Sequence, residues 1–274
     1  MKKIIAALDN SLAATPVLAT TQTLAKLLDA RVEAVHVTAK GNRVVRAAAQ
    51  RAGVPLRFLE GNVVEAVVAA AHEPDVVVAV VGARATPGSA RPLGTTALAV
   101  AEKVRSPLVA VPPDVRPVGE LHRILVPVEG DATMAPVPGA IIEIARTAGT
   151  RAIEVIVLHV LEESSLPAFT DQPQHERTAW AREFVRRFCP WGIGAVSLET
   201  RVGRSDELIP HAAKEKDVDL IALGWAQELA EGRARVVRAA LERSGVPVML
   251  VPARVVGGSR EAEPSWSGSQ LSPA

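Results

Sequence analysis

A stretch of glycines, hydroxyls and arginines in the first half of the chain has the chemistry of a phosphate site. Glycines let the backbone turn sharply and approach a ligand closely. Amides at the start of a helix are free donors, and the helix dipole favours an anion there. The residues that would take part are Gly82, Arg84, Gly88, Arg91, Gly94, Thr95 and Thr96. The pattern predicts phosphate binding, although a flexible loop and an ordinary helix cap use the same residue types.

An acidic residue closes the first apolar run of the chain. Asp9 follows IIAAL, Gly82 follows VVVAVV, and His36 lies near the end of another apolar run. If these runs are parallel strands of one open sheet, their carboxyl ends meet at one edge, where such sheets bind ligands. Asp9 is therefore expected beside the glycine-containing loop. His36, with His159 at the matching place in the second half, is expected to serve packing or hydrogen bonding at a strand end.

Other kinds of catalytic site have no support in the sequence. No group of His, Cys, Asp and Glu residues has the spacing of metal ligands, and neither a G-x4-G-K-[ST] loop nor a G-x-S-x-G elbow occurs. The single cysteine, Cys189, is interpreted as a small buried apolar residue. We therefore predict no catalytic residues and no metal ligands, and leave open at most a slow hydrolysis of a bound phosphate compound.

The elements that must position these residues occur twice. IIAALD at 4–9 is echoed by ILVPVE at 124–129, and VEAVHV at 32–37 by VIVLHV at 155–160. Two further pairs follow in the same order. These are EGNVVEAVVAAAHEPDVVVAVVGAR with VGRSDELIPHAAKEKDVDLIALGWA, and SPLVAVPP with GVPVMLVPA. Four matches in one order indicate a duplication.

Each copy has the pattern of strands alternating with helices. The strand-like runs are rich in Val, Ile and Leu and show little polar alternation, which is typical of strands buried on both faces of a parallel sheet. We predict an α/β fold of two tandem, doubly wound parallel-sheet domains of the Rossmann-like type. The expected organisation is a first domain at 1–113, a linker at 114–122, a second domain at 123–253 and a disordered tail at 254–274.

Composition and charge exclude several broad classes. The 274 residues carry a formal net charge of +1, which argues against a nucleic-acid binder and against a membrane-surface protein. Residues 1–113 hold 13 basic and 8 acidic side chains. This mildly basic half suits an anionic small ligand, although drift of a few surface charges would look the same. One cysteine fits a reducing compartment, and no apolar run is long enough to span a membrane, so we expect a cytoplasmic protein.

The order of these features resembles the universal stress protein (UspA-like) family, over essentially residues 1–253 as two copies. In that family the first strand ends in Asp, the fourth ends in Gly, and a G-x2-G-x9-G-[S/T] loop precedes the last helix and strand. Asp9, Gly82 and Gly94-Thr95 match these positions. The resemblance implies an adenine nucleotide alpha hydrolase-like fold and binding of ATP, with Mg²⁺ entering alongside it. It also implies that the loop holds the phosphates, that Asp9 lies near the ribose and that aliphatic strand ends hold the adenine.

The sequence departs from the family pattern in both copies. In the first, Ala85 stands at the position of the middle glycine and the stretch from there to Gly94 is one residue short, for which Gly88 would partly compensate. In the second, Glu129 replaces the strand-end Asp, and Ala234-Arg235 stands where the closing Gly-[S/T] belongs. We therefore expect a degenerate second site.

A tryptophan directly follows the strand-end glycine of the second copy. Trp225 stands after Gly224, where the first copy has Ala83. One hypothesis is that its indole fills the vacant ligand pocket, and an ordinary core or interface tryptophan explains the residue equally well.

Two functional hypotheses follow from different classes. The leading one is a stress-response protein whose first domain binds ATP or a related adenine nucleotide, with a regulatory output. The alternative is a tandem scaffold that binds no nucleotide and acts through protein–protein interaction. The altered loop favours the scaffold, whereas the intact Asp9 and Gly94-Thr95-Thr96 argue against it. The resemblance also implies that the two domains pair through the segments SPLVAVPP and VPVMLVP. A homodimer is left open, and neither nucleic acid nor a membrane is expected as a partner.

Overall fold

The computed structural model of the chain describes residues 1–37, 42–84, 93–115, 119–128, 153–161, 196–227 and 234–252. Several residues named above lie outside this part of the chain, and their predicted roles stay predictions. These are Ala85, Gly88, Arg91, Glu129, Cys189 and the tail at 254–274.

The first half of the chain alternates strands and helices as the sequence predicts. Its elements are β1 (Lys3–Ala7), α1 (Ala14–Leu28), β2 (Arg31–Val37), α2 (Arg43–Ala52), β3 (Leu56–Leu59), α3 (Val63–Ala71), β4 (Val76–Gly82), α4 (Thr95–Ala101) and β5 (Leu108–Val111). The described elements of the second half are β6 (Arg123–Val128), β7 (Glu154–Leu161), β8 (Val196–Val202), α7 (Ser205–Glu215), β9 (Leu220–Trp225), α8 (Arg235–Arg243) and β10 (Val248–Pro252).

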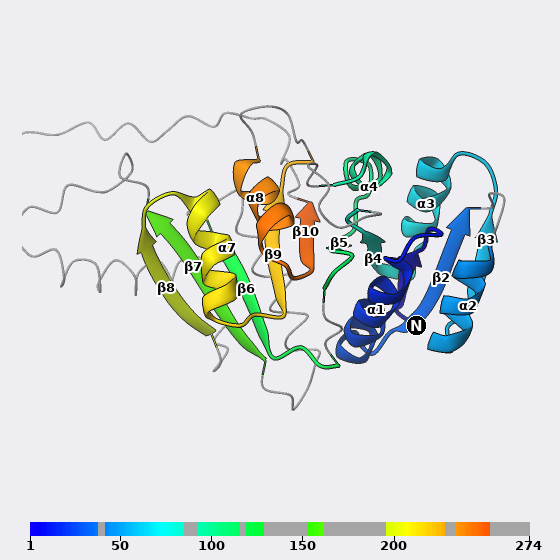
Figure 1. The fold of residues 1–274 in the computed structure, drawn as a ribbon, viewed down its shortest axis with the longest axis horizontal. Coiled ribbons are helices and arrows are strands. Elements are labelled where there is room, and N and C mark those ends of the chain that lie inside the picture. The colour runs from blue at the N-terminus through cyan, green and yellow to red at the C-terminus, as the bar shows by residue number, and fades with distance from the viewer. Residues whose placement is uncertain are drawn as a thin grey trace, which may run out of the picture.

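The described strands form one continuous ten-stranded sheet (Figure 1), in the order β3-β2-β1-β4-β5-β10-β9-β6-β7-β8. The pairs within each half are parallel, which confirms the α/β class with parallel sheets. The two halves meet where β5 and β10 pair antiparallel, with Val109 opposite Met249. These strands lie in the two segments expected to meet, and their pairing joins the two predicted sheets into one.

Local sequence signals explain where several helices begin and end. Asn62 caps α3, because its side-chain oxygen accepts hydrogen bonds from the backbone N–H groups of Val64 at 3.0 Å and Glu65 at 3.2 Å. Asp29 ends α1 in the left-handed conformation with φ of 49°, and its N–H donates to the carbonyl of Ala25. Such residues are tolerated there because a short polar side chain costs little in that region.

The core is aliphatic and covers both faces of the sheet. One face packs under α1 and α2 and runs on into the second half, with Ile4, Ala34, Val80, Val109, Ile124, Val155 and Met249 among its buried residues. The other face packs under α3, α4, α7 and α8, with Val67, Ala101, Leu108, Leu125, Ile209, Leu223, Trp225 and Leu250. Because both clusters include residues of both halves, apolar burial holds the halves together in addition to the strand pairing.

A buried lysine organises a charged cluster at the edge of the first half. Lys3 is 4 % exposed, and its ammonium group contacts the carboxylates of Glu73, Glu33 at 3.2 Å and Asp75 at 3.4 Å. Arg57 pairs with Glu73 at 2.8 Å. Burial opposes the charge of Glu73, but hydrogen bonds from Lys3 and Arg57 outweigh it and leave the pKa of Glu73 below its ordinary value. The pKa values of Lys3 and Arg57 are raised and that of Asp75 is lowered, so the pairing favours the charged forms of these groups.

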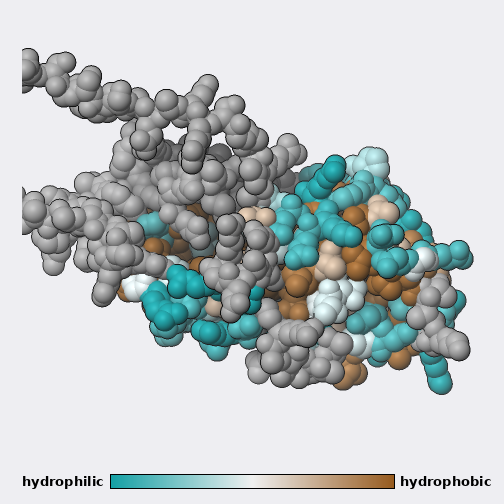
Figure 2. All heavy atoms as spheres, turned by 90° about the horizontal axis from the view of Figure 1, so that it is seen from above, coloured by the Kyte–Doolittle hydropathy of each residue, from teal (hydrophilic) through white to brown (hydrophobic). Residues whose placement is uncertain are grey.

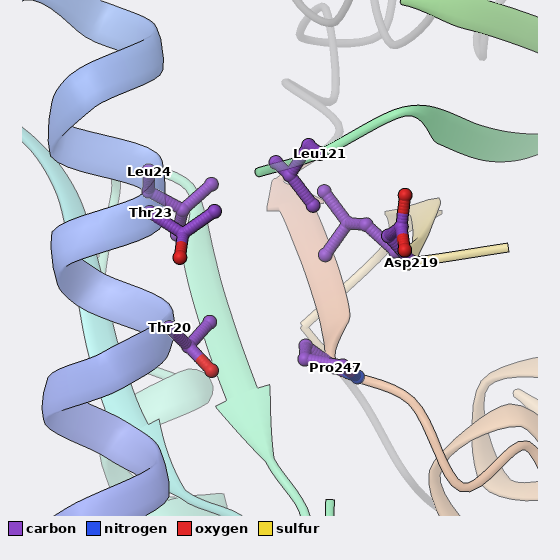
Figure 3. A pocket seen from close by; sticks show the side chains of 7 residues that line it. Thr20, Thr23, Leu24, Leu121, Asp219 and Pro247 are labelled. Carbon is purple, nitrogen blue, oxygen red and sulfur yellow. The ribbon is translucent and has the colours of Figure 1, made fainter. Parts of the chain in front are cut away.

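A small cavity lies in the seam between the halves (Figure 3). Thr20, Thr23 and Leu24 of α1 face Leu121, Asp219, Leu220 and Pro247 across it. The volume is about 10 Å³, which is room for one water molecule. Asp219 already accepts hydrogen bonds from the backbone N–H groups of His122 at 2.6 Å and Arg123 at 2.9 Å. The hydrogen bonds of Asp219 therefore fix the start of β6. The cavity itself is too small for a ligand.

No helix in the described parts of the chain combines the length and the apolar character that crossing a bilayer requires.

Candidate functional site

A pocket of about 340 Å³ opens at the carboxyl ends of β1, β2 and β4. In the strand order, β1 stands between β2 and β4, so the chain leaves β1 toward one side of the sheet and later returns on the other. Such switch points are where open parallel sheets bind ligands. The pocket is lined by Ala7, Leu8, Asp9, Asn10, Val35, His36, Val37, Val63, Val67, Val81, Gly82, Thr96, Ala97 and Val100.

The lining brings together three of the predicted site residues. Asp9 comes from the end of β1, Gly82 from the last position of β4, and Thr96 from the first turn of α4. These residues are far apart in the sequence and meet because parallel strands carry their carboxyl ends to one edge. Apart from them, most of the wall is aliphatic, and Val63 at the rim is about half exposed. Figure 2 shows apolar side chains between hydrophilic ones at the surface of the first half.

Asp9 is held by the turn that leads into α1. Its Oδ1 accepts hydrogen bonds from the backbone N–H of Ser11 at 3.0 Å and from the Ser11 hydroxyl. The hydroxyl oxygen in turn accepts the N–H of Ala13 at 3.1 Å, just before the helix begins. This side-chain turn is a common use of Asp and Ser near helix starts. It fixes the exposed carboxylate at the mouth of the pocket through one of its two oxygens.

Gly82 lies where α1 approaches β4 closely, as well as in the lining of the pocket. A Cβ at this position would lie 3.2 Å from the Cβ of Ala13 and 3.8 Å from Val17. The first distance is tighter than ordinary van der Waals contact, so the missing side chain lets α1 approach β4. The sequence predicts a ligand contact for Gly82, and the structure adds the close approach of α1 as a second reason for a glycine here.

The other predicted loop residues lie around the pocket with different exposures. Gly94 is the N-cap of α4 and makes no side-chain cap, and Thr95 and Thr96 are exposed in the first turn. The helix begins at Thr95, directly after Gly94, which takes the extended conformation of a cap. Arg84 is partly buried, and its Nε has no hydrogen-bond partner within the described structure. Neither Gly94, Thr95 nor Arg84 lines the pocket directly.

The two strand histidines have the role expected of them. The Nδ1 of His36 lies 2.8 Å from the carbonyl oxygen of Leu8, and the Nδ1 of His159 lies 2.9 Å from that of Val128. Because a carbonyl only accepts, Nδ1 carries the proton in both rings. Burial lowers the pKa of His159 and outweighs its bond to Val128, which favours the neutral ring. Each histidine thus ties the end of the first strand of its half to the second.

The second half differs at the corresponding place. Gly224 is present, but Trp225 beside it is only 2 % exposed and packs in the apolar cluster under α7 and α8. Ala234 caps α8 in the left-handed conformation, with φ of 52°, where Gly94 caps α4 in the extended one. The burial of Trp225 fits both a core residue and a filled pocket, so the hypothesis of a plugged second site stays a prediction.

Sequence reasoning missed the helical walls of the pocket. Val63 and Val67 of α3 and Val100 of α4 line it, yet apolar helix residues at this spacing are typical of ordinary core. Their alignment with Asp9 depends on how α3 and α4 lie across the strand ends. Among the described residues, no group of three His, Cys, Asp or Glu side chains is arranged to hold a metal ion.

Comparisons with known proteins place the second half in a known group. The model of the universal stress protein family matches residues 120–252. A protein of unknown function from Pseudomonas aeruginosa PAO1 is similar in structure, with a TM-score of 0.68 and 14 % identity over 92 % of this chain and 93 % of that one. A universal stress protein from Archaeoglobus fulgidus DSM 4304 has a TM-score of 0.61 and 16 % identity over 92 % and 98 % of the two chains. The sequence matches none of the curated proteins with which it was compared. At these identities the two structures show that the fold is shared.

Proposed function

We propose that the chain is a member of the universal stress protein family, whose model matches residues 120–252, and that its first half binds ATP or a closely related adenine nucleotide. The output is regulatory rather than catalytic, and the second half is a structural partner whose own site is degenerate. As a stress-response protein of this kind, it is expected in the cytoplasm.

The pocket at the ends of β1, β2 and β4 carries this proposal. Its volume of about 340 Å³ lies in the range of small-molecule sites, which are commonly concave, mostly apolar and equipped with few polar groups. Val35, Val67 and Val81 offer an aliphatic surface for a flat base. Asp9 at the mouth offers a carboxylate whose Oδ1 is engaged by Ser11, which leaves the second oxygen to accept a ribose hydroxyl.

The phosphates would extend from the pocket toward the loop that follows β4. Thr96 supplies a hydroxyl on this side of the lining, and the N–H groups near Gly94 and the charge of Arg84 lie at the two ends of the loop. The roles of Gly88 and Thr95 belong to the same proposal. A nucleotide held in this way would bring its own Mg²⁺, because that ion is often bound mainly by phosphate oxygens and water.

The composition of the lining favours binding over catalysis. Asp9 is the sole carboxylate among the described lining residues, and none of them is a lysine. Its Oδ1 is committed to the turn at Ser11, and the lining residues that the structure describes include no second acid to act as its partner. Phosphoryl transfer needs positioned charges around the transferred group, which this aliphatic wall does not offer.

Calorimetry on the full chain tests the proposal. Titration with ATP and Mg²⁺ is expected to give a 1:1 complex, because only the first half carries the pocket described. Asp9→Asn keeps the acceptor for Ser11 but removes the charge, and should weaken binding by about tenfold, as expected for loss of a charged hydrogen bond. Asp29→Asn is the matched control, because it removes the same charge from the end of α1, where Asn is well tolerated. Absence of heat at millimolar ATP would refute the proposal and favour the scaffold.

A further inference from the structure

A glutamine of the second half contacts the end of a helix of the first half. The side-chain Nε2 of Gln227 lies 2.7 Å from the carbonyl oxygen of Val104, 3.2 Å from that of Glu102 and 3.5 Å from that of Ala101. All three carbonyls belong to the last turn of α4 or the residues directly after it. We propose that Gln227 is a positioning residue through which the second half holds α4, and with it one wall of the pocket.

The chemistry of a helix end suits a side-chain amide. The last carbonyls of a helix have no partner within the helix, and they form its negative end. The Nε2 group of glutamine carries two N–H donors. At Gln227 these donors point at a cluster of three acceptors, so the amide acts as a cap that is supplied by another part of the chain.

Gln227 lies just beyond the end of a strand that is paired and packed in the core. Gln227 itself has φ of 59°, in the left-handed region that non-glycine residues seldom adopt without compensation. Two residues earlier, Trp225 is the last residue of β9, where it pairs with Pro252 of β10 and has its indole buried. Gln227 therefore lies two residues beyond a paired strand, and the last residue of that strand, Trp225, has its side chain buried in the core.

The helix that Gln227 holds is also a wall of the pocket. Thr96, Ala97 and Val100 of α4 line the pocket, and the helix has only seven residues, or about 10 Å at 1.5 Å each. Figure 1 shows α4 on the side of the first half that is nearest to α8 and β10. A shift at the held end is therefore transmitted over two turns to the lining residues.

The internal repeat places Gln227 at the position that corresponds to Ala85 in the first half. The offset that aligns Gly82 with Gly224 also aligns Ala85 with Gln227, because both positions stand three residues after the glycine. In the second half, this position is thus used to support the first half and not to meet a ligand of its own. The two halves therefore differ: the first carries the pocket, and the second supports α4, one wall of that pocket, through Gln227.

Hydrogen exchange of the ligand-free full chain tests the support directly. Gln227→Glu keeps the shape of the side chain but replaces the donors by a carboxylate facing three carbonyls. We expect the hydrogen-bonded amides of α4 and its C-terminal end, at 98–104, to exchange at least about fivefold faster, as expected for loss of a hydrogen-bonded cap. Gln22→Glu is the matched control, because the Nε2 of Gln22 donates in the same way to the carbonyl of Ala52 at the end of α2, at 2.7 Å. It should speed exchange near α2 and leave α4 unchanged.

A donor variant separates hydrogen bonding from packing. Gln227→Lys restores N–H donors and adds a positive charge, which is favourable at a helix C-terminus, so the α4 amides should remain protected as in the wild type. Equal exchange of α4 in wild type and Gln227→Glu, or equal acceleration by Gln22→Glu, would overturn the proposal. Should Gln227→Glu unfold the chain as a whole, the lysine variant decides: wild-type protection supports the proposal, and faster exchange of α4 contradicts it.

The effect on ligand affinity rests on the proposed function and has its own readout. ATP titrated into Gln227→Glu should bind about five- to tenfold more weakly than into the wild type, with Gln22→Glu unchanged, because part of the binding energy must first order α4. If the wild type itself binds no ATP, the proposed function fails while the exchange of α4 still judges the role of Gln227. If ATP binds equally to both variants despite faster exchange of α4, the link from helix to pocket is wrong.

Discussion

The backbone N–H of Gly94 donates a hydrogen bond to the carbonyl oxygen of Ala83 at 2.8 Å. This bond closes the neck of the loop between β4 and α4, so that the end of the strand and the start of the helix are fixed side by side. A Cβ on Gly94 would lie 3.7 Å from the same oxygen, an ordinary van der Waals distance, and the φ of −64° is open to any residue. The protein alone therefore does not require glycine here.

This geometry predicts opposite effects on stability and binding at Gly94. In Gly94→Asp the side chain can cap α4, which should raise the free energy of unfolding by a few tenths of a kcal/mol to about 1 kcal/mol. The same carboxylate would repel a phosphate, so the affinity for ATP should fall by at least about tenfold. Urea denaturation and calorimetry measure the two effects. Gly119→Asp adds the same charge where a side chain meets nothing within 4 Å, and should change neither. Unchanged affinity in Gly94→Asp would mean that no phosphate approaches this loop.

A side chain at Gly82, unlike one at Gly94, should lower the stability of the protein. Gly82→Ala places a methyl group 3.2 Å from the Cβ of Ala13, so α1 must move away from β4. We expect the free energy of unfolding to drop by about 1–3 kcal/mol, the usual cost of overpacking, measured by urea denaturation with Gly119→Ala as the control. A stable Gly82→Ala protein would show that α1 adjusts without cost and that the glycine is needed for another reason.

The charged cluster around Lys3 predicts a specific acid sensitivity. Because the pKa of Glu73 is lower in the folded chain than its ordinary value of 4.5, the stability it contributes is complete above that value and is lost as the pH falls through the folded pKa. Glu73→Gln should therefore cost roughly 1–2 kcal/mol at pH 7, and the difference from wild type should shrink toward pH 3. For Glu65→Gln, at an exposed position of α3, the free energy of unfolding should follow that of the wild type in parallel across the pH range. A constant difference across the pH range would contradict the assigned role of Glu73.

Substitutions of Trp225 test whether the second half retains a nucleotide site that the indole fills. Trp225→Ala should destabilise the protein by about 3–5 kcal/mol, because the indole is buried in the core under α7 and α8, whereas Trp225→Phe should cost less. If the indole fills a former pocket, calorimetry of the alanine variant should show a second molecule of adenine nucleotide bound. A ratio that stays at 1:1 would identify Trp225 as an ordinary core residue.

Some features of the fold and the pocket follow from the local sequence and the direction of the strands, and others depend on how the elements pack. Features fixed by local chemistry could be predicted: β2 was expected at 32–37 and is found at Arg31–Val37, and Asp9, Gly82 and Thr96 meet because strand direction dictates it. Features that depend on how elements pack could not. Val67 and Val100 look like core residues until α3 and α4 are placed, and Gln227 looks like a surface glutamine until the second half lies against the first.

Among the described strands, β5 and β10 form the one antiparallel pair, and this junction has a consequence for how such a chain could arise. A separated half would expose the edge of one of these apolar strands, and the simplest cover would be an identical copy, so each half would have to suit itself as a partner. Covalent fusion removes that constraint, because every molecule then carries one of each half in a fixed ratio. A mutation in one half is no longer imposed on both sides of the junction. The two halves can therefore diverge in sequence while the pairing of β5 with β10 is kept.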